Sequence, residues 1–429
     1  MKSKVVLWSV VSVLMSGAAV GAFLWLIRPQ SVMLGDGTKL TLLGVEYGKH
    51  HKYPVVKTKS GGRRNFGGPS SFDTTNDTLV VWILQETKSN QRYGWQALVS
   101  DRAGTGAVMS WARNWRDAGT GRQVAAVQLD AFPRRDGKFL MRFISWGPQG
   151  QRVSKEQLLI SNPARRGPFP KWTPDPLPDT QSDDDLNVTL TKCIFPVEGF
   201  NGRGLSAKDP ANKAVAVAFH CEQKGVTVTN WQPLRIETSD AMGNQVQNNS
   251  WSNSRDENGD AKMTYQYGLW PREPWKLRVE MSRTSGFHDD ELWTVENIQV
   301  TSGRQMDFWN YGHNNGHART NAPFAETTLN GFHLKLYPAV QFTDANWGNG
   351  EKPGGFHVEV DPQPPDGYRM TLAKGTDEKG RAIETWGPSW GGGSYGFQFQ
   401  NLRNAKLLNV TIALHKSRFV EFTVKPAKP

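Results

Sequence analysis

Five short sequence patterns recur three times along the chain in the same order, and this recurrence limits the fold more than any other feature. The first pattern is apolar or alternating, and it reads "LTLLGVEYG" from Leu40, "LNVTLTKCI" from Leu186 and "LNGFHLKLY" from Leu329. Alternation between apolar and polar residues has the two-residue period of a β-strand with one buried face. Three copies at a period of about 140 residues indicate three tandem repeats.

The second and third patterns are also strands. The second begins at Thr78, Ala214 and Gly355. The third is a strand that ends in an Asp-x-x-Gly turn, as "WQALVSDRAG", "LRIETSDAMG" and "MTLAKGTDEKG". An aspartate accepts hydrogen bonds from its own turn and a glycine adopts positive φ, so this chemistry predicts hairpins.

The fourth pattern joins an aromatic residue, a polar turn and a strand. It reads "FPRRDGKFLMRF" from Phe132, "WPREPWKLRVEM" from Trp270 and, less clearly, "FQNLRNAKLLNVTI" from Phe399. We interpret its proline as the start of an edge strand, where the missing N–H is tolerated. The alternative is that Arg134 and Arg135 bind a phosphate or carboxylate. The fifth pattern is a strand that closes each repeat, as "EQLLISNP", "ELWTVENI" and "RFVEFTVKP".

Short strands with many turns predict an all-β fold of three tandem antiparallel β-sandwich domains, and the 43 Gly and 25 Pro residues agree with this. The predicted organisation is a transmembrane segment at 1–30, domain 1 at 34–163, a Pro-rich linker at 164–185, domain 2 at 186–300, a Gly/Asn-rich linker at 301–327 and domain 3 at 328–427.

An uncharged apolar stretch, Val5 to Ile27, predicts one membrane-spanning helix. Lys2 and Lys4 precede it and favour a cytoplasmic N-terminus, which places the rest of the chain outside the cytoplasm as a signal-anchored protein, periplasmic or at the cell surface. The alternatives are a signal peptide that is cleaved before Phe23 and a buried core helix. The anchor and the signal peptide both predict export.

Two cysteines, Cys193 and Cys221, fall on neighbouring predicted strands of the second repeat. Cysteine pairs in exported proteins tend to form bridges, so we expect a disulfide. The alternative is two separate buried thiols.

Motifs for catalysis or metal binding are weak. No nucleophile elbow, Walker loop, His-Glu-x-x-His or Cys-x-x-Cys motif is present. The weak candidates are His313 with His317, the run from His288 to Glu291, and a calcium-like "RDENGDAK" with Asp256, Asn258 and Asp260. We interpret them as loop and turn residues, and expect no catalytic residue, cofactor or metal.

The seventeen tryptophans raise the possibility of an aromatic surface that binds a ligand. Trp386, Trp390 and Tyr395 lie in the Gly-rich stretch "ETWGPSWGGGSYGF", where exposed rings could stack on a sugar or polymer. Packing in the core is the alternative. The net charge of +11 permits anionic partners, but the basic residues are dispersed, and we expect no nucleic acid.

In its tandem β-sandwich organisation the chain resembles membrane-anchored bacterial proteins built of immunoglobulin-like modules. The antibody-type Cys, Trp, Cys spacing is absent, and no motif quoted above ties the chain to one characterised family. The resemblance implies adhesion, scaffolding or ligand display. We therefore expect a non-enzymatic structural or interaction protein with a protein or glycan partner; the alternative is a carbohydrate-directed protein, either a binding module or a hydrolase.

Overall fold

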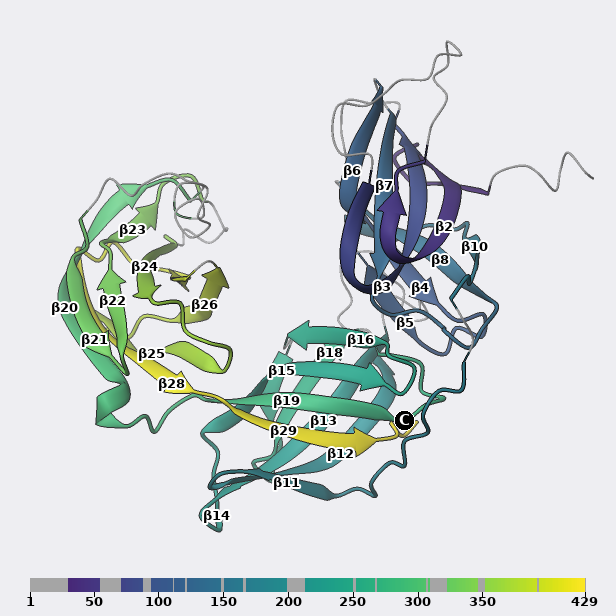
Figure 1. Cartoon of the computed structure of the whole chain (residues 1–429). Helices are drawn as coiled ribbons and strands as arrows, with labels where there is room; N and C mark the ends of the chain where they lie inside the picture. The colour runs from purple at the N-terminus through teal and green to yellow at the C-terminus, as the bar shows by residue number, and fades with distance from the viewer. Residues whose placement is uncertain are drawn as a thin grey trace, which may run out of the picture.

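The computed structural model describes the residues in these ranges: 30–54, 71–87, 94–110, 112–119, 122–147, 150–164, 167–198, 213–249, 252–266, 268–305, 308, 322–345, 352–391 and 393–428. Strands form nearly all of their regular structure, in five sheets, which confirms the all-β prediction. Every strand pair but one is antiparallel, the exception being β20 with β23. Figure 1 shows three groups of strands, which we call units one, two and three.

Unit one consists of two five-stranded sheets that share one apolar core. The first has the order β1-β2-β3-β7-β6, with β1 at Ser31–Met33, β2 at Lys39–Lys52, β3 at Ser71–Glu86, β7 at Arg122–Leu129 and β6 at Ala112–Gly119. The second has the order β10-β8-β4-β5 with β9 beside β8, and its strands are β10 at Leu158–Ser161, β8 at Lys138–Gly147, β4 at Trp95–Ser100, β5 at Ala107–Ser110 and β9 at Gly150–Val153.

Unit two also pairs two sheets around a core. The larger has the order β11-β12-β13-β18-β17 with β14 beside β13, and its strands are β11 at Asp179–Asp183, β12 at Leu186–Glu198, β13 at Lys213–Gln223, β18 at Ala261–Gln266, β17 at Ser252–Arg255 and β14 at Val226–Thr227. The smaller has the order β16-β15-β19-β29, with β16 at Gln245–Asn249, β15 at Trp231–Asp240, β19 at Trp275–Arg283 and β29 at Arg418–Val424.

Unit three is a single nine-stranded sheet with its own core. Its main path is β21-β22-β24-β23-β20-β28-β25, and β27 pairs with both β24 and β26. A bridge between Thr376 and Ala382 brings the end of β25 to the start of the β26 hairpin, so the sheet curls back toward itself. The strands are β20 at Leu292–Gly303, β21 at Ala325–Leu329, β22 at Phe332–Leu336, β23 at Ala339–Phe342, β24 at Gly354–Asp361, β25 at Tyr368–Asp377, β26 at Thr385–Gly391, β27 at Ser394–Phe399 and β28 at Leu407–Lys416.

The three Asp-x-x-Gly turns form as predicted. The carboxylate of Asp101 accepts the N–H of Thr105 at 2.7 Å, and that of Asp240 accepts the N–H of Met242 at 2.9 Å. Asp377 makes the same two-residue contact with the N–H of Lys379 at 2.9 Å. The glycines of these turns have φ of 65°, 81° and 75°, which is the positive φ that the pattern requires.

The closing strands of the second and third repeats are exchanged. β20, the fifth pattern of the second repeat, pairs with β28 in unit three. β29, the fifth pattern of the third repeat, pairs with β19 in unit two. In unit one the equivalent pair, β8 with β10, comes from a single repeat. Figure 1 shows the chain passing from β28 in unit three directly into β29 in unit two.

A one-residue connection explains this exchange. Only Ser417 separates β28 from β29. An antiparallel hairpin needs a loop of at least about two residues, so β29 is unable to fold back on β28 and continues forward into another sheet. There Val420, Phe422 and Val424 are 4%, 1% and 1% exposed and join the core of unit two. β20, at Leu292–Gly303, pairs with β28 in the position that β29 would occupy in a hairpin.

The exchange changes the predicted boundaries. Unit three is a continuous insertion from β20 to β28, and unit two consists of two segments, one on each side of it. The boundary predicted at residue 300 falls inside β20, and the predicted third domain contains β29, which lies in unit two. The predicted linker 164–185 contains β11, and the linker predicted at 301–327 begins inside β20 and ends inside β21, with most of its middle outside the described residues.

Units one and two dock reciprocally through the fourth pattern and the Asp turn. Asn244, which ends the turn of unit two, accepts the N–H of Phe132 and the Nε–H of Arg134, both at 3.1 Å. On the other side, Arg272 Nη2 of unit two lies 3.6 Å from Asp101 Oδ2 in the turn of unit one. The fourth pattern of each unit therefore contacts the Asp-x-x-Gly turn of the other, which is the arrangement found in the self-complementary interface of a twofold dimer.

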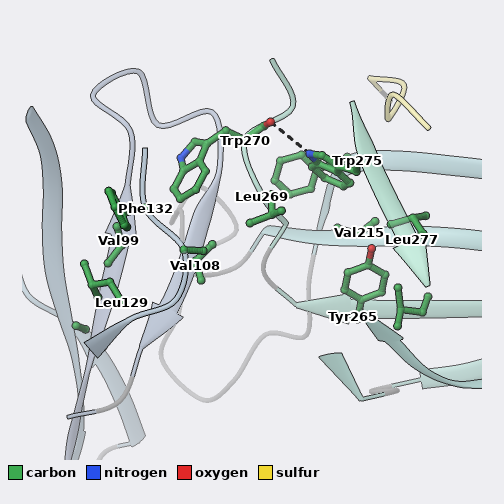
Figure 2. Close-up of a cluster of buried hydrophobic side chains, with 14 of the residues drawn as sticks. Val99, Val108, Leu129, Phe132, Val215, Tyr265, Leu269, Trp270, Trp275 and Leu277 are labelled. Atoms are coloured by element: carbon green, nitrogen blue, oxygen red, sulfur yellow. Dashed lines mark hydrogen bonds between the residues drawn. The ribbon is translucent and has the colours of Figure 1, made fainter. Parts of the chain in front are cut away.

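Two aromatic residues fill the centre of this interface. Figure 2 shows the indole of Trp270 directed toward Phe132 and Val108 of unit one, while the Trp270 carbonyl oxygen accepts the Nε1–H of Trp275 at 3.3 Å. Phe132 and Trp270 are 0% and 3% exposed. The recurrence of "FPRR" and "WPRE" thus has a cause that the sequence interpretation missed: both copies are docking segments, and Arg135 pairs across the interface with Glu273 at 2.8 Å.

Candidate functional site

The junction between units two and three buries the charged side chains of Glu280 and Arg283 and partly buries those of Arg235 and Arg369. Two segments cross it: Ser417, and residues 284–291, which include the 3-10 turn η2 at Asp289–Glu291. The crossings bring β15 and β19 of unit two against β25 of unit three.

A buried carboxylate on β19, Glu280, links the two units. Its side chain is 1% exposed and lies 3.0 Å from Nε of Arg235 on β15. On its other side is Arg369 of unit three, with 2.6 Å between Arg369 Nε and Glu280 Oε1. Asp366, in the loop before β25, lies 3.0 Å from Arg235 Nη2 and completes the network. Positive and negative groups alternate, so no charge in the network is buried alone.

The charges of this network lower the pKa of Asp366 below its ordinary value. Burial opposes the shift, but the hydrogen bond from Arg235 and the positive charges of Arg235 and Arg369 outweigh it. Asp366 is therefore ionised at neutral pH, and the contact between the loop before β25 and β15 is an ion pair.

A second cluster holds η2 against the end of β19. The guanidinium carbon of Arg283 lies 5.5 Å from the ring centre of Trp231 and 5.7 Å from that of Phe287. Arg283 also pairs with Glu291 of η2, and Glu291 accepts the N–H of His288 at 2.9 Å. Stacked and paired in this way, the guanidinium has a fixed position at the wall of the junction.

The imidazole of His415, two residues before Ser417, is fully buried at the same junction. Its Nε2 lies 3.1 Å from the Thr371 hydroxyl, and its ring centre is 4.9 Å from that of Phe287. Burial, reinforced by the positive charge of Arg283, lowers its pKa to about 4. The ring is neutral at pH 7.

Two hollows open at this junction, and Tyr368 lines both. The first has a volume of about 310 Å³ and lies between the units. Its wall carries three cationic and three acidic side chains, namely Arg283, Lys416, Arg418, Asp185, Asp290 and Glu291. The second has a volume of about 560 Å³ and is lined by unit three alone, through the 363–366 loop, Arg369 and Tyr395. Ligand sites commonly occur in clefts between units, as the first hollow is, with volumes of roughly 300–1,000 Å³.

The predicted disulfide does not form, and the strand register gives the reason. Cys193 pairs with Val217 and Cys221 with Val188, so the cysteines lie four residues apart along neighbouring strands. At roughly 3.3 Å per residue this offset is about 13 Å, whereas a disulfide needs Cα atoms about 4.4–6.8 Å apart. Both are buried free thiols, and burial raises the pKa of each to about 12.

The predicted stacking residues lie on a hairpin and not in a Gly-rich loop. Trp386 and Trp390 belong to β26, and Trp390 pairs through its backbone with Tyr395 on β27. The side chains of both tryptophans fall outside the described residues. Tyr395 is 3% exposed, and burial raises its pKa to about 12, so its ring packs largely in the core and forms no exposed stacking platform.

The calcium-like run forms a hairpin tip, as the preferred interpretation predicted. Asp256 Oδ1 accepts the N–H of Asn258 and of Asp260, both at 3.0 Å. Asp260 faces away and contacts Nδ1 of His220 at 2.9 Å. Asp256 and Asp260 therefore have separate partners, and in the described ranges no group of three or more His, Cys, Asp or Glu side chains is arranged to hold a metal ion.

The remaining candidates divide between the junction and the undescribed residues. The run from His288 to Glu291 lies at the junction, where Glu291 pairs with Arg283 and His288 and Asp290 line the first hollow. His313 and His317 fall outside the described residues, as does the predicted membrane helix from Val5 to Ile27. No helix within the described ranges has the length and apolar character to cross a membrane.

No protein-family model matches this chain, and no curated protein matches it either.

Sequence reasoning missed Arg235, Glu280, Asp366 and Arg369, which form the core of the site. Arg235 and Glu280 occupy ordinary polar positions of alternating strands, so nothing in the pattern marks them, and their burial depends on the packing of unit three against them. The available signal was the single residue between "IALHK" and "RFVEFTV", which excludes a hairpin and so predicts that two units share strands.

Proposed function

We propose that this chain is a non-enzymatic, membrane-anchored protein that displays three coupled β units, two of them β-sandwiches and the third a curled nine-stranded sheet, outside the cytoplasm as a structural or interaction module. Unit one would comprise residues 31–161, unit two 179–283 with 418–428, and unit three 289–416. The immunoglobulin-like character expected from the sequence belongs to this proposal. So does the anchor from Val5 to Ile27, with the two preceding lysines in the cytoplasm.

The observation that carries the proposal is the way both junctions are built. Units one and two share a continuous apolar core with Trp270 at its centre. Units two and three exchange closing strands and bury Glu280 between two arginines. Buried contacts of this kind fix the relative orientation of units, whereas independent modules on linkers are joined by small, polar interfaces. A fixed orientation suits a protein whose role is to hold binding surfaces at set positions.

Location and rigidity test the proposal separately. We expect the intact chain in the membrane fraction after a carbonate wash, with a C-terminal tag that external protease removes once the outer barrier is opened. A tag protected from protease, or a cytoplasmic soluble chain, would overturn the location.

For rigidity, small-angle X-ray scattering of residues 30–429 should fit one conformation, with an unchanged radius of gyration between low and moderate salt. Scattering that only a broad ensemble of unit orientations can fit would contradict a fixed arrangement. The alternative function, a carbohydrate-directed protein, is favoured by one specific feature, the pair of hollows around Tyr368.

A further inference from the structure

We infer that the two hollows at the junction of units two and three bind a neutral oligosaccharide that crosses Tyr368. This inference deepens the proposed interaction role by naming a ligand class, and it rests on that role only for its biological setting. The binding measurement itself requires neither the membrane nor export.

The charge balance of the first hollow argues for a neutral ligand. Three cationic side chains face three acidic ones across its wall, and most are already paired: Arg283 with Glu291, and Arg418 with Asp184 at 3.0 Å. Such a wall has little net field to concentrate an anion, and the carboxylates would repel a phosphate. An acyl chain would need apolar walls, which this hollow lacks because eight of its eleven lining side chains are Asp, Glu, Arg, Lys, Gln or Asn.

The guanidinium and carboxylate groups on the wall of the first hollow also suit the hydroxyl groups of a sugar. Guanidinium and carboxylate groups each present two donors or two acceptors side by side, which matches the spacing of neighbouring hydroxyls on a sugar ring. Arg283 is held by its two aromatic neighbours and by Glu291, so it is fixed in place before a ligand arrives. A preorganised polar wall loses little conformational entropy on binding.

The position of Tyr368 argues for more than one sugar unit. Its ring lines both hollows, so a ligand that fills both must pass over it. Lys416 places its Nζ 5.5 Å from the centre of this ring, and because Lys416 is exposed, its ammonium can donate to a hydroxyl of a ligand that crosses the ring. An amphipathic ring between a polar hollow and one lined partly by prolines and tyrosines can serve as a platform for the apolar face of a sugar.

The experiment titrates purified residues 30–429 with neutral tetrasaccharides and follows binding by calorimetry and saturation-transfer NMR. The probes are cello-, xylo-, manno-, chito- and maltotetraose, with tetragalacturonate and inorganic phosphate as charged comparisons. We expect one neutral class to bind with a Kd of about 1 mM or tighter, and its tetramer to bind at least about tenfold more tightly than its monosaccharide, because two hollows are filled.

Surface variants locate the site with matched controls. Asp290→Ala and Lys416→Ala remove exposed lining groups, and each should weaken binding about fivefold or more. Asp289→Ala, one residue away on η2 and outside the lining, and Lys425→Ala on the C-terminal tail should bind as the unchanged protein does. All four residues are exposed, so the fold should be retained, and circular dichroism verifies it.

Three results would overturn the inference: no neutral tetrasaccharide saturates the protein, the charged probes bind more tightly, or Asp290→Ala and Lys416→Ala bind as the controls do. These outcomes are separate from the location and rigidity tests. A rigid, exported chain that binds no sugar would refute the ligand class alone, and a sugar-binding chain with mobile units would refute the fixed display alone.

Discussion

Deleting unit three while keeping β29 should leave unit two folded, whereas a fragment that ends before β29 should not. The first variant joins Ser282 to Ser417 through Asn-Gly, which deletes residues 283–416. Met281 pairs with Arg418, so Ser282 and Ser417 are the next pair along the ladder, and a two-residue loop closes the β19–β29 hairpin. The second variant is the continuous fragment 30–303, which keeps β20 and lacks β29.

The cost of losing β29 follows from the side chains that it buries. Val420, Phe422 and Val424 are at most 4% exposed. At about 1.5–3 kcal/mol for each large apolar side chain, their loss amounts to roughly 5–9 kcal/mol. This approaches the total stability of an ordinary domain, about 5–15 kcal/mol. The fragment 30–303 should therefore have an unfolded or loosely packed unit two.

Hydrogen exchange of the β19 amides separates these outcomes. In the excision variant β19 keeps its partners on both sides, and its amides should be protected as in the full chain. In the fragment 30–303 they should exchange at least about a hundredfold faster, since local protection follows the free energy of opening. Equal protection of β19 in both variants would refute the strand exchange, because it would mean that β29 is dispensable to unit two.

Three further predictions concern single residues. Glu280→Gln removes the charge shared by Arg235 and Arg369, whose side chains are 20% and 18% exposed. In urea titrations this change should lower the free energy of unfolding by about 3 kcal/mol. A change below about 1 kcal/mol would show that water already screens the network. Gly106→Ala would place a methyl group 2.9 Å from the Leu269 carbonyl oxygen, so it should separate units one and two and enlarge the radius of gyration. The control, Gly44→Ala, adds a methyl group with nothing within 4 Å and should leave the radius of gyration unchanged. The pKa of His415 is lowered from 6.5 to about 4, so between these values the unfolded state binds a proton that the folded state does not. The free energy of unfolding should therefore fall by about 2 kcal/mol between pH 7 and pH 5. His415→Asn should abolish this dependence, and an unchanged pH profile in that variant would contradict the assignment.

The strands were predictable from the sequence because burial of one face leaves a local signal. The alternation in "LNVTLTKCI" and "AVAVAFHCE" matches β12 and β13, and the Asp-x-x-Gly turns have the hydrogen bonds that their residues predict. The disulfide failed for a different reason: placing Cys193 and Cys221 on neighbouring strands was right, but a bridge depends on register, and a four-residue offset leaves the same pattern of alternation.

The junction could not be predicted from a periodic pattern, because alternation gives the face of a strand and not its partner. β20 and β29 are both amphipathic closing strands at equivalent positions of their repeats, so alternation alone does not say which sheet each one completes. The choice is made by the connection, where Ser417 is too short to turn. Once β29 has entered unit two, Glu280 and Arg235 lie beside Arg369 and Asp366 of unit three, and charges that appear isolated in the sequence become mutually compensating. The exchange is therefore the cause of the candidate site: it brings together the side chains that seal the junction and the two walls of the first hollow, which Tyr368 joins to the second.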